Sequence, residues 1–253
     1  PRGLLILAEF QDVHFQPGNT QAEMDSMLNA NNYSYDISLG SARKYFQDQS
    51  NGTYNPHFDV VGPVVLPDSM AYYGHNLETD DERDGDDAMI GDFVLHACSI
   101  ASQLPGVDLS LYDNDNDGEV DFVYIIYAGY GEADGGGANT MWPASFHLPS
   151  AIYWGYSSLP SDAYWDTSNY TFDGVMVGSF AYSGELNYID SYYQTRGYSL
   201  RNPMRNGIGT FCHEFSHVIG LPDYYDTEYG YNYQHHLTPG EWSLMDGGSY
   251  NGD

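Results

Sequence analysis

The sequence predicts an α/β (α+β) fold that combines strands and helices in one domain. Two apolar runs, residues 4–8 and 120–127, have the length and composition of buried strands. Residues 88–104 and 208–219 instead repeat apolar side chains at helical spacing. The 253 residues are enough for one large core, and no linker interrupts the even composition, so we expect a single domain over residues 1–253.

The amino-terminal part is expected to contain strands on either side of a helix. The apolar run at residues 4–8 predicts a buried strand, and a polar stretch follows it. Residues 41–46 have the pattern of a helix that runs into an Asn-Gly turn. The segment 58–66 predicts a pair of strands broken at Gly62-Pro63.

Residues 88–104 show the first complete amphipathic helix pattern. An acidic loop, residues 78–87, precedes this helix, and Pro105-Gly106 ends it. Its apolar side chains fall on one stripe at about 100° per residue, and they are Ile90, Phe93, Val94, Ala97, Ala101 and Leu104.

The middle of the chain predicts an interior strand followed by irregular structure. Residues 120–127 are apolar on both faces, which is typical of a strand covered on two sides. Residues 129–137 form a glycine-rich loop. Residues 138–205 are rich in Tyr, Ser and Gly and contain short strand patterns, of which residues 175–177 are the clearest.

The charge excludes several classes of partner. The chain has 36 acidic residues, 26 Asp and 10 Glu, against 7 basic ones, for a formal net charge of −29. Such a field repels phosphate backbones and anionic membrane surfaces, so we expect no nucleic-acid partner. A hydrophobic content of 42% argues against disorder, and no run approaches the ~18 apolar residues of a membrane span.

An extracellular setting is expected for this chain. Its acidic composition suits a salt-adapted surface or a protein that collects divalent cations outside the cell. The chain begins at Pro1 rather than Met and shows no signal peptide, so we expect it to be a processed piece whose signal and pro-segment are not in this sequence.

The segment 210–223 contains a His-Glu-x-x-His motif formed by His213, Glu214 and His217. Residues four apart on a helix lie about 40° apart around its axis, so the two imidazoles can hold one Zn²⁺ together. Glu214 is adjacent and can reach a water without binding the metal. The other side of this helix forms an apolar stripe of Ile208, Phe211, Cys212, Phe215, Val218 and Ile219.

A third zinc ligand is expected at Asp223. Gly220 allows the chain to leave the helix in a left-handed conformation, so the chain can bend back and return a carboxylate six residues after the second histidine. Asp226 and Glu241 are the alternative ligands, and Asp223 as an ordinary turn residue is the interpretation without a metal.

Downstream of the motif, Ser243-Leu244-Met245 is followed by two glycines and resembles the Met-turn of metzincin proteases. In that turn a methionine lies beneath the metal as an apolar floor; an ordinary core methionine is the alternative. Tyr250 is a candidate for steadying an oxyanion, with a packed surface aromatic as the alternative.

The motifs together resemble the immune inhibitor A family of secreted bacterial metalloproteases. The zinc segment HEFSHVIGLPDYYD carries the likeness, and further similar stretches lie at residues 45–52, 58–64, 117–131 and 242–250. The resemblance implies secretion, an inhibitory pro-segment and zinc endopeptidase activity.

The same resemblance implies a metzincin-like zincin catalytic domain with a twisted mixed sheet, a backing helix and an active-site helix. A short lower lobe would contain the Met-turn. On this division the upper lobe covers residues 1 to about 220 and the lower lobe about 221 to 253, with its closing helix expected beyond residue 253.

Residues 113–121 read D-x-D-x-D-G-x-x-D, a pattern that can wrap Ca²⁺. The twelfth position is Tyr124 rather than Glu, so the loop is not a complete EF-hand. Clustered carboxylates repel one another without a counter-ion, which favours calcium over a solvated acidic turn. The expected ligands are the side chains of Asp113, Asp115, Asp117 and Asp121 and the main-chain carbonyl of Glu119.

The sequence therefore predicts a zinc endopeptidase that acts on protein or peptide substrates, with Glu214 as general base. One alternative is a non-catalytic, calcium-dependent binding or adhesion module with a vestigial zinc site. Another is a zinc hydrolase with non-peptide substrates. Nucleophile motifs such as G-x-S-x-G are absent from the sequence.

Three further expectations concern features outside these motifs. Cys98 and Cys212 lie on two helices expected to pack together, so a disulfide and two buried thiols are equal alternatives. The Tyr-rich segment 152–198 is a candidate lining for a peptide cleft. An acidic surface favours basic substrates.

Overall fold

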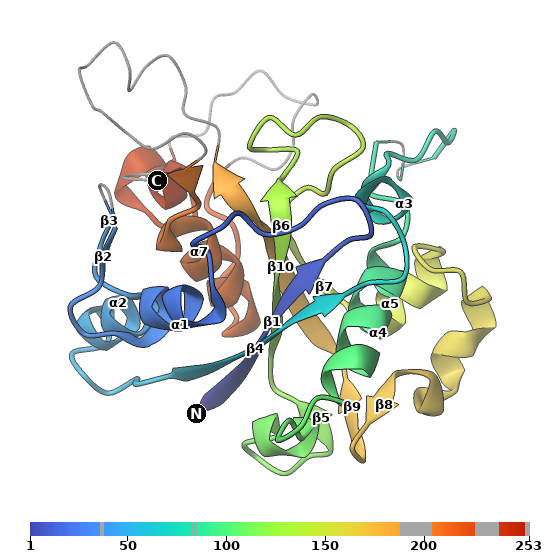
Figure 1. Cartoon of the computed structure of the whole chain (residues 1–253), viewed down its shortest axis with the longest axis horizontal. Helices are drawn as coiled ribbons and strands as arrows, with labels where there is room; N and C mark the ends of the chain where they lie inside the picture. Colours follow the sequence, from blue (N-terminus) through green and yellow to red (C-terminus); the bar gives the residue numbers. More distant parts are fainter. Residues whose placement is uncertain (36–37, 82, 84, 188–203, 226–237, 251–253) are drawn as a thin grey trace.

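A mixed sheet of six strands forms the centre of the described chain (Figure 1). The computed structural model describes residues 1–35, 38–81, 83, 85–187, 204–225 and 238–250. The strand order is β11-β10-β6-β1-β4; β10, β6, β1 and β4 run parallel, while β7 and β11 pair antiparallel with β10. The strands are β1 (Arg2–Glu9), β4 (His57–Val65), β6 (Val123–Tyr130), β7 (Ala144–His147), β10 (Ser179–Asn187) and β11 (Met204–Arg205).

Both faces of this sheet are covered by helices (Figure 1). Apolar side chains of the sheet contribute to two separate cores, one on each face. The helices of the first face are α3 (Met70–Gly74), α4 (Ile90–Ala101) and α5 (Leu148–Trp154). Those of the second face are α1 (Gln21–Asn29), α2 (Ala42–Gln49) and α7 (Ile208–Val218).

Smaller elements lie around this framework. A two-stranded sheet pairs β2 (Ser34–Tyr35) with β3 (Ser38–Leu39), and a three-stranded one has the order β5-β9-β8, formed by Glu119–Val120, Val175–Val177 and Thr171–Phe172. The 3-10 helices are η1 (Leu109–Tyr112), η2 (Ser161–Trp165), η3 (Thr167–Tyr170), η4 (Gly240–Trp242) and η5 (Gly247–Tyr250).

The two-sided burial explains why β1 is continuously apolar. Leu4 and Ile6 belong to the core of the first face, and Leu5 and Leu7 to the core of the second face. Successive side chains of a strand point to opposite faces, so a strand with two covered faces needs apolar residues at every position. The predicted interior strand at residues 4–8 is confirmed by β1, and the part of residues 120–127 from Val123 onward is confirmed by β6; the α/β fold class is confirmed with them.

The predicted amphipathic helices are also confirmed. Ser41 caps α2 by accepting a hydrogen bond from the Lys44 amide. The predicted apolar stripe of α4 is buried against the sheet, from Ile90 to Ala101. The helix ends at Ala101, three residues before the predicted end, and turns connect it to the next segment.

Two expectations for the sheet need correction, and a third is confirmed. The pair of strands at residues 58–66 is one strand, β4, whose register with β1 shifts at Gly62-Pro63, where Gly62 has φ +98°. The apolar run 120–127 is split, because Val120 ends β5 while β6 begins at Val123. The strand pattern at 175–177 is confirmed as β9, but the main sheet is continued by the separate strand β10.

Helix α1 lies in the polar stretch for which the sequence predicted no element. Thr20 caps it through the Glu23 amide, and only Met24, Met27 and Leu28 supply its buried apolar face. The stripe is too short to stand out from its polar neighbours, so packing against β4 decides this helix rather than its own periodicity.

The two cysteines lie on opposite faces of the sheet. Cys98 of α4 belongs to the core of the first face and Cys212 of α7 to that of the second. The expectation that these two helices pack together is therefore wrong, and of the two alternatives the structure supports two buried thiols rather than a disulfide.

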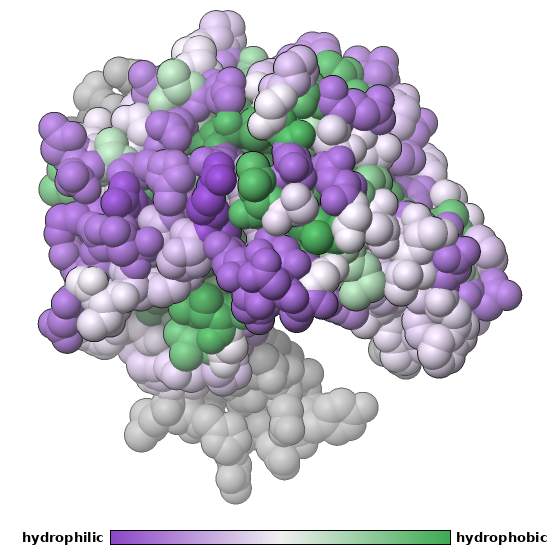
Figure 2. Space-filling view, turned by 90° about the horizontal axis from the view of Figure 1, so that it is seen from below, coloured by the Kyte–Doolittle hydropathy of each residue, from purple (hydrophilic) through white to green (hydrophobic). Residues whose placement is uncertain are grey.

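The face of the molecule seen from below Figure 1 is mostly hydrophilic, with small hydrophobic patches between polar groups (Figure 2). Within the described residues, no helix is both long and apolar enough to span a bilayer.

The predicted division of the chain into an upper lobe, residues 1 to about 220, and a lower lobe, about 221 to 253, stays a prediction.

Phe215 is expected to be a major stabilising residue of the second core. Its side chain is 4% exposed, and its ring contacts those of Phe46, Phe58 and Phe122 at centroid distances of 5.1, 5.1 and 4.6 Å. We expect Phe215→Ala to lower the free energy of unfolding by about 3–5 kcal/mol in urea titrations, because it leaves a cavity. Ile219→Ala at the end of the same helix, 46% exposed, should cost about 1 kcal/mol or less. Equal losses for the two variants would contradict this assignment.

Candidate metal centre

Helix α7 carries His213, Glu214 and His217 toward a cavity and packs its opposite side against the sheet. Phe211, Cys212 and Phe215 are buried in the core of the second face, as the predicted stripe requires. Ile219 is the exception in that stripe, since it lies beyond the last turn and is largely exposed.

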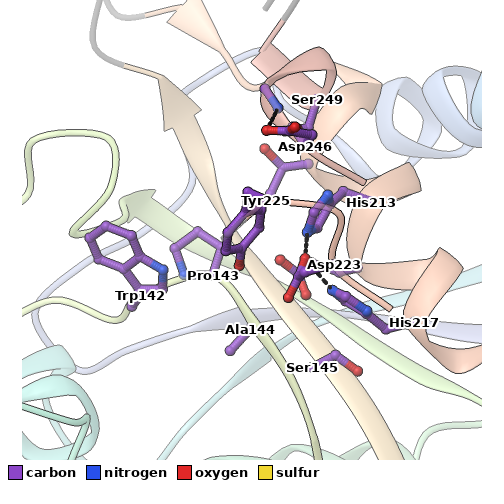
Figure 3. A pocket seen from close by; sticks show the side chains of 13 residues that line it. Trp142, Pro143, Ala144, Ser145, His213, His217, Asp223, Tyr225, Asp246 and Ser249 are labelled. Atoms are coloured by element: carbon purple, nitrogen blue, oxygen red, sulfur yellow. Dashed lines mark hydrogen bonds and ion pairs between the residues drawn. The ribbon is translucent and has the colours of Figure 1, made fainter. Parts of the chain in front are cut away.

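The two imidazoles lie side by side, one helical turn apart, with ring centroids separated by 4.9 Å. Asp223 completes the group, because its Oδ1 lies 3.2 Å from His213 Nε2 and 3.3 Å from His217 Nε2 (Figure 3). Gly220, with φ +92°, produces the left-handed exit from the helix that returns the chain to this point. The sequence predicted both the neighbouring imidazoles and this turn.

Two main-chain carbonyls orient the rings. His213 Nδ1 lies 2.8 Å from the carbonyl oxygen of Leu244, and His217 Nδ1 lies 2.8 Å from that of Leu221. A carbonyl oxygen only accepts hydrogen bonds, so in each neutral ring the hydrogen is assigned to Nδ1 and the lone pair to Nε2. Both lone pairs then face Asp223.

The resulting donor set fits a divalent cation. Asp223 Oδ1 is buried and has no hydrogen-bond donor among the described residues. Two imidazole lone pairs and one carboxylate oxygen, all within 4.8 Å of one another, repel unless a positive charge lies between them. Two histidines and a carboxylate with the imidazole hydrogens held by carbonyls are a donor set that suits zinc, and main-chain partners of this kind orient zinc ligands.

Glu214 lines the same cavity but is not part of the converging group. It is 7% exposed, and burial raises the pKa of its carboxyl to about 8, with a smaller contribution from the Asp223 carboxylate. A carboxyl with such a raised pKa can take up and release a proton near neutral pH.

The cavity over these residues has a volume of about 810 Å³. Three segments distant in sequence form its walls, with Tyr225 projecting between them (Figure 3). We call it the metal cavity; it is lined by Trp142, Pro143, Ala144, Ser145, Thr210, His213, Glu214, His217, Asp223, Tyr225, Asp246, Gly247 and Ser249. A volume of this size accommodates several residues of an extended peptide.

The segment predicted to be a Met-turn lies against the group formed by His213, His217 and Asp223. The main-chain carbonyl of Leu244 accepts the hydrogen bond from His213. The carbonyl of the next residue, Met245, accepts a 2.7 Å hydrogen bond from the Tyr224 amide. Met245 is 2% exposed. The turn therefore connects His213 to Tyr224, the residue that follows Asp223. The role of Met245 as an apolar floor beneath a metal stays a prediction.

Of the three remaining candidates in this region, the structure describes the side chain of Glu241 alone. Glu241 is exposed in η4 and is not one of the residues whose donor atoms converge. Asp226 and the side chain of Tyr250 lie outside the described residues. The tyrosine that lines the metal cavity, among the described side chains, is Tyr225.

The Asp-rich loop brings together three of its five predicted ligands. Asp113, Asp115 and Asp117 each offer a carboxylate oxygen, and these oxygens lie within 4.8 Å of one another. Asp121 instead accepts hydrogen bonds from the amide and the side chain of Asn114, at 2.5 and 2.9 Å. Glu119, the fifth predicted ligand, is the first residue of β5 within this segment.

Sequence reasoning missed one wall of the metal cavity, residues 142–145, and the contributions of Tyr225, Asp246 and Ser249. Tyr225 and Asp246 are adjacent in sequence to predicted site residues, and this position could have identified them. Residues 142–145 carry no comparable signal in the sequence, because only the pairing of β7 with β10 places them at the metal cavity. The described part of the Tyr-rich segment, residues 152–187, does not line this cavity.

Comparison with known families gives one match over almost the whole chain. Residues 6–253 match the family described as immune inhibitor A peptidase M6, catalytic domain. The match agrees with the metzincin-like zincin fold that the sequence resemblance implied.

Individual relatives are more distant. The chain is 28% identical over 230 residues to "Immune inhibitor A" of Bacillus thuringiensis subsp. alesti, covering 83% of this chain and 28% of that protein. It is 27% identical over 232 residues to "Pre-pro-metalloprotease PrtV" of Vibrio cholerae serotype O1, covering 84% and 21%. A stretch of 47 residues is 45% identical to a "Putative secreted metallopeptidase" of Arthroderma benhamiae, covering 19% and 7%. The chain thus spans less than a third of the length of these relatives.

Zinc titration tests the converging group. We expect the chain to bind about one zinc in this site, and His217→Ala to lose that binding because a ligand is missing. Binding is measured by competition with a chromophoric chelator, and the metal content by mass spectrometry. His57→Ala, which removes an exposed histidine of β4, is the matched control and should bind as the unaltered chain does. Unchanged affinity in His217→Ala would contradict the assignment.

Proposed function

The chain belongs to the immune inhibitor A peptidase M6 family of metallopeptidases, and from this premise we propose that it is a secreted zinc endopeptidase in which Glu214 is the general base. The observation that carries the proposal is the convergence of His213, His217 and Asp223 with both imidazole hydrogens held by main-chain carbonyls. The names of the relatives, two of which print "metalloprotease" or "metallopeptidase", support the same class of activity.

His213, His217 and Asp223 would hold the ion. When bound, zinc polarises a carbonyl and makes a water more acidic. Glu214 accepts the proton of the attacking water and donates it to the nitrogen of the departing amine. Its burial supports this role, because a desolvated carboxylate is a stronger base than a solvated one.

An extended peptide is the substrate that best suits the wall of the metal cavity. Strand β7 pairs with β10 along one edge, and its first residues, Ala144 and Ser145, line the cavity. A peptide can continue the sheet at such an edge through main-chain hydrogen bonds, which favour polypeptides over small non-peptide substrates.

The alternative of a calcium-dependent binding module with a vestigial zinc site is less well supported. Glu214 is not part of the converging group, yet it is buried and lines the metal cavity. A site kept only for structure would not need a desolvated carboxylate there, because its burial is costly.

Replacing Glu214 tests the mechanism. We expect Glu214→Gln to lower the rate of casein or peptide hydrolysis by roughly 10²–10⁴-fold, since proton transfer is lost. Zinc content should stay the same, because Glu214 is not a ligand. Glu78→Gln, an exposed acidic residue, is the matched control and should keep full activity. Hydrolysis at the normal rate by Glu214→Gln, or hydrolysis that survives removal of zinc by a chelator, would contradict the proposal.

We propose in addition that residues 113–121 bind Ca²⁺. The support is the clustering of the Asp113, Asp115 and Asp117 carboxylates in a loop whose glycine, Gly118, has φ +93°. Calcium should raise the melting temperature of the chain by mass action, and Asp115→Asn should reduce that shift. Asp162→Asn, in exposed η2, is the control. If calorimetry detects no calcium binding to the chain, the proposed calcium site is refuted.

A further inference from the structure

A second cavity, of about 530 Å³, opens beside the metal cavity. We call it the Asp87 pocket. It shares Trp142 and Ala144 with the metal cavity, so the two are neighbours. Its walls are mostly aromatic and its polar groups mostly carboxylates; the lining residues are Gly85, Asp86, Asp87, Ile90, Glu132, Trp142, Ala144, Phe146, Tyr156 and Tyr182.

Asp87 is a buried carboxylate with an unused oxygen. The residue is 7% exposed. Its Oδ2 accepts hydrogen bonds from the Trp142 amide at 2.8 Å and from the Tyr182 hydroxyl at 3.4 Å, while its Oδ1 has no partner among the described residues. Burial raises the pKa of Asp87 to about 7, with a smaller contribution from the Glu132 charge. A cation beside this group would offset the cost of burying it.

The other two carboxylates of the Asp87 pocket, those of Asp86 and Glu132, are also acceptors. Asp86 accepts a 2.5 Å hydrogen bond from the Tyr156 hydroxyl. Glu132 accepts a weak hydrogen bond from the side-chain amide of Asn76 at 3.4 Å. No Lys, Arg or His is among the residues that line the pocket. The described lining of the pocket therefore carries three carboxylates and no cationic side chain; Arg83, whose charge acts on Tyr156, is paired with Asp81.

The arrangement suits an extended organic cation better than a metal ion. The carboxylates of Asp86, Asp87 and Glu132 do not form a converging group of the kind found at His213 and in the Asp-rich loop. A guanidinium or ammonium group spreads its donors over several acceptors, and its aliphatic stem packs on aromatic rings. Phe146, Tyr156 and Tyr182 supply such rings.

The position of the Asp87 pocket connects it to substrate. Ala144 and Phe146 of β7 both line it, and alternate residues of a strand share one face of a sheet. A peptide paired along β7 would likewise send alternate side chains to this face. We propose that the Asp87 pocket binds an arginine or lysine side chain of the substrate, next to the bond that is cut. This inference rests on the proposed peptidase function.

The test compares arginine with citrulline, which has the same shape and no charge. Matched fluorogenic peptides carry one or the other at each position around the scissile bond. We expect at least one position at which arginine raises kcat/KM about tenfold or more, since the pair with Asp87 is a charge-assisted hydrogen bond. Asp87→Asn, which keeps the shape and an acceptor for the Trp142 amide, should remove that preference. Asp80→Asn, an exposed acid in the same loop, is the matched control and should keep it.

Direct binding separates this proposal from the peptidase function. Nα-acetyl-arginine amide is titrated into the chain by NMR, with the citrulline analogue as reference. Binding of the arginine probe that is lost in Asp87→Asn supports the pocket even if no peptide is cut. Cleavage without any preference for arginine over citrulline leaves the peptidase in place and overturns the pocket. The comparison on the unaltered chain holds whether or not Asp87→Asn folds.

Discussion

The hydrogen bonds from His213 and His217 to the carbonyls of Leu244 and Leu221 orient the candidate metal centre, and its geometry depends on them. These hydrogen bonds orient both rings so that their Nε2 atoms face the carboxylate of Asp223. Each of these bonds joins α7 to a segment that follows it, so the centre forms only when the chain after the helix has folded back. Phe211 and Phe215 pack into the second core and hold the helix against the sheet.

The sheet explains why a single edge can serve two cavities. It is covered on both faces, so the metal helix α7 lies on one side and α4 and α5 on the other. Strand β7 lies at the border, and its residues line the metal cavity as well as the Asp87 pocket. The chain has a formal net charge of −29, but charge spread over a surface selects no particular ligand. A desolvated carboxylate in an aromatic pocket is selective, because its burial is compensated only by a matching cation.

The errors of sequence interpretation share one physical cause. Residues 58–66 resembled two strands because Gly62-Pro63 is a typical breaker, yet the parallel neighbour β1 continues past it and a bulge absorbs the irregularity. β10 contains Ser183, Gly184 and Glu185, which few strand patterns would include, and it is recognisable only by its partners β6 and β7. Cys98 and Cys212 were placed on helices that seemed able to meet, whereas the sheet lies between them. In each case the decisive contact joins residues far apart in the chain.

Elements with a complete periodicity and a motif with local geometry could be predicted from the sequence alone. These are the strands β1 and β6, the helices α4 and α7, the neighbouring imidazoles, and the left-handed exit at Gly220 that brings Asp223 within reach. Such features depend on residues a few positions apart, whose relative directions a helix or turn already specifies. Only the tertiary structure decided which carbonyls orient the rings, which strand forms the opposite wall, and that Asp87 is buried beside it. Those relations are set by strand pairing and packing between distant segments, for which the amino-acid order contains no local signal.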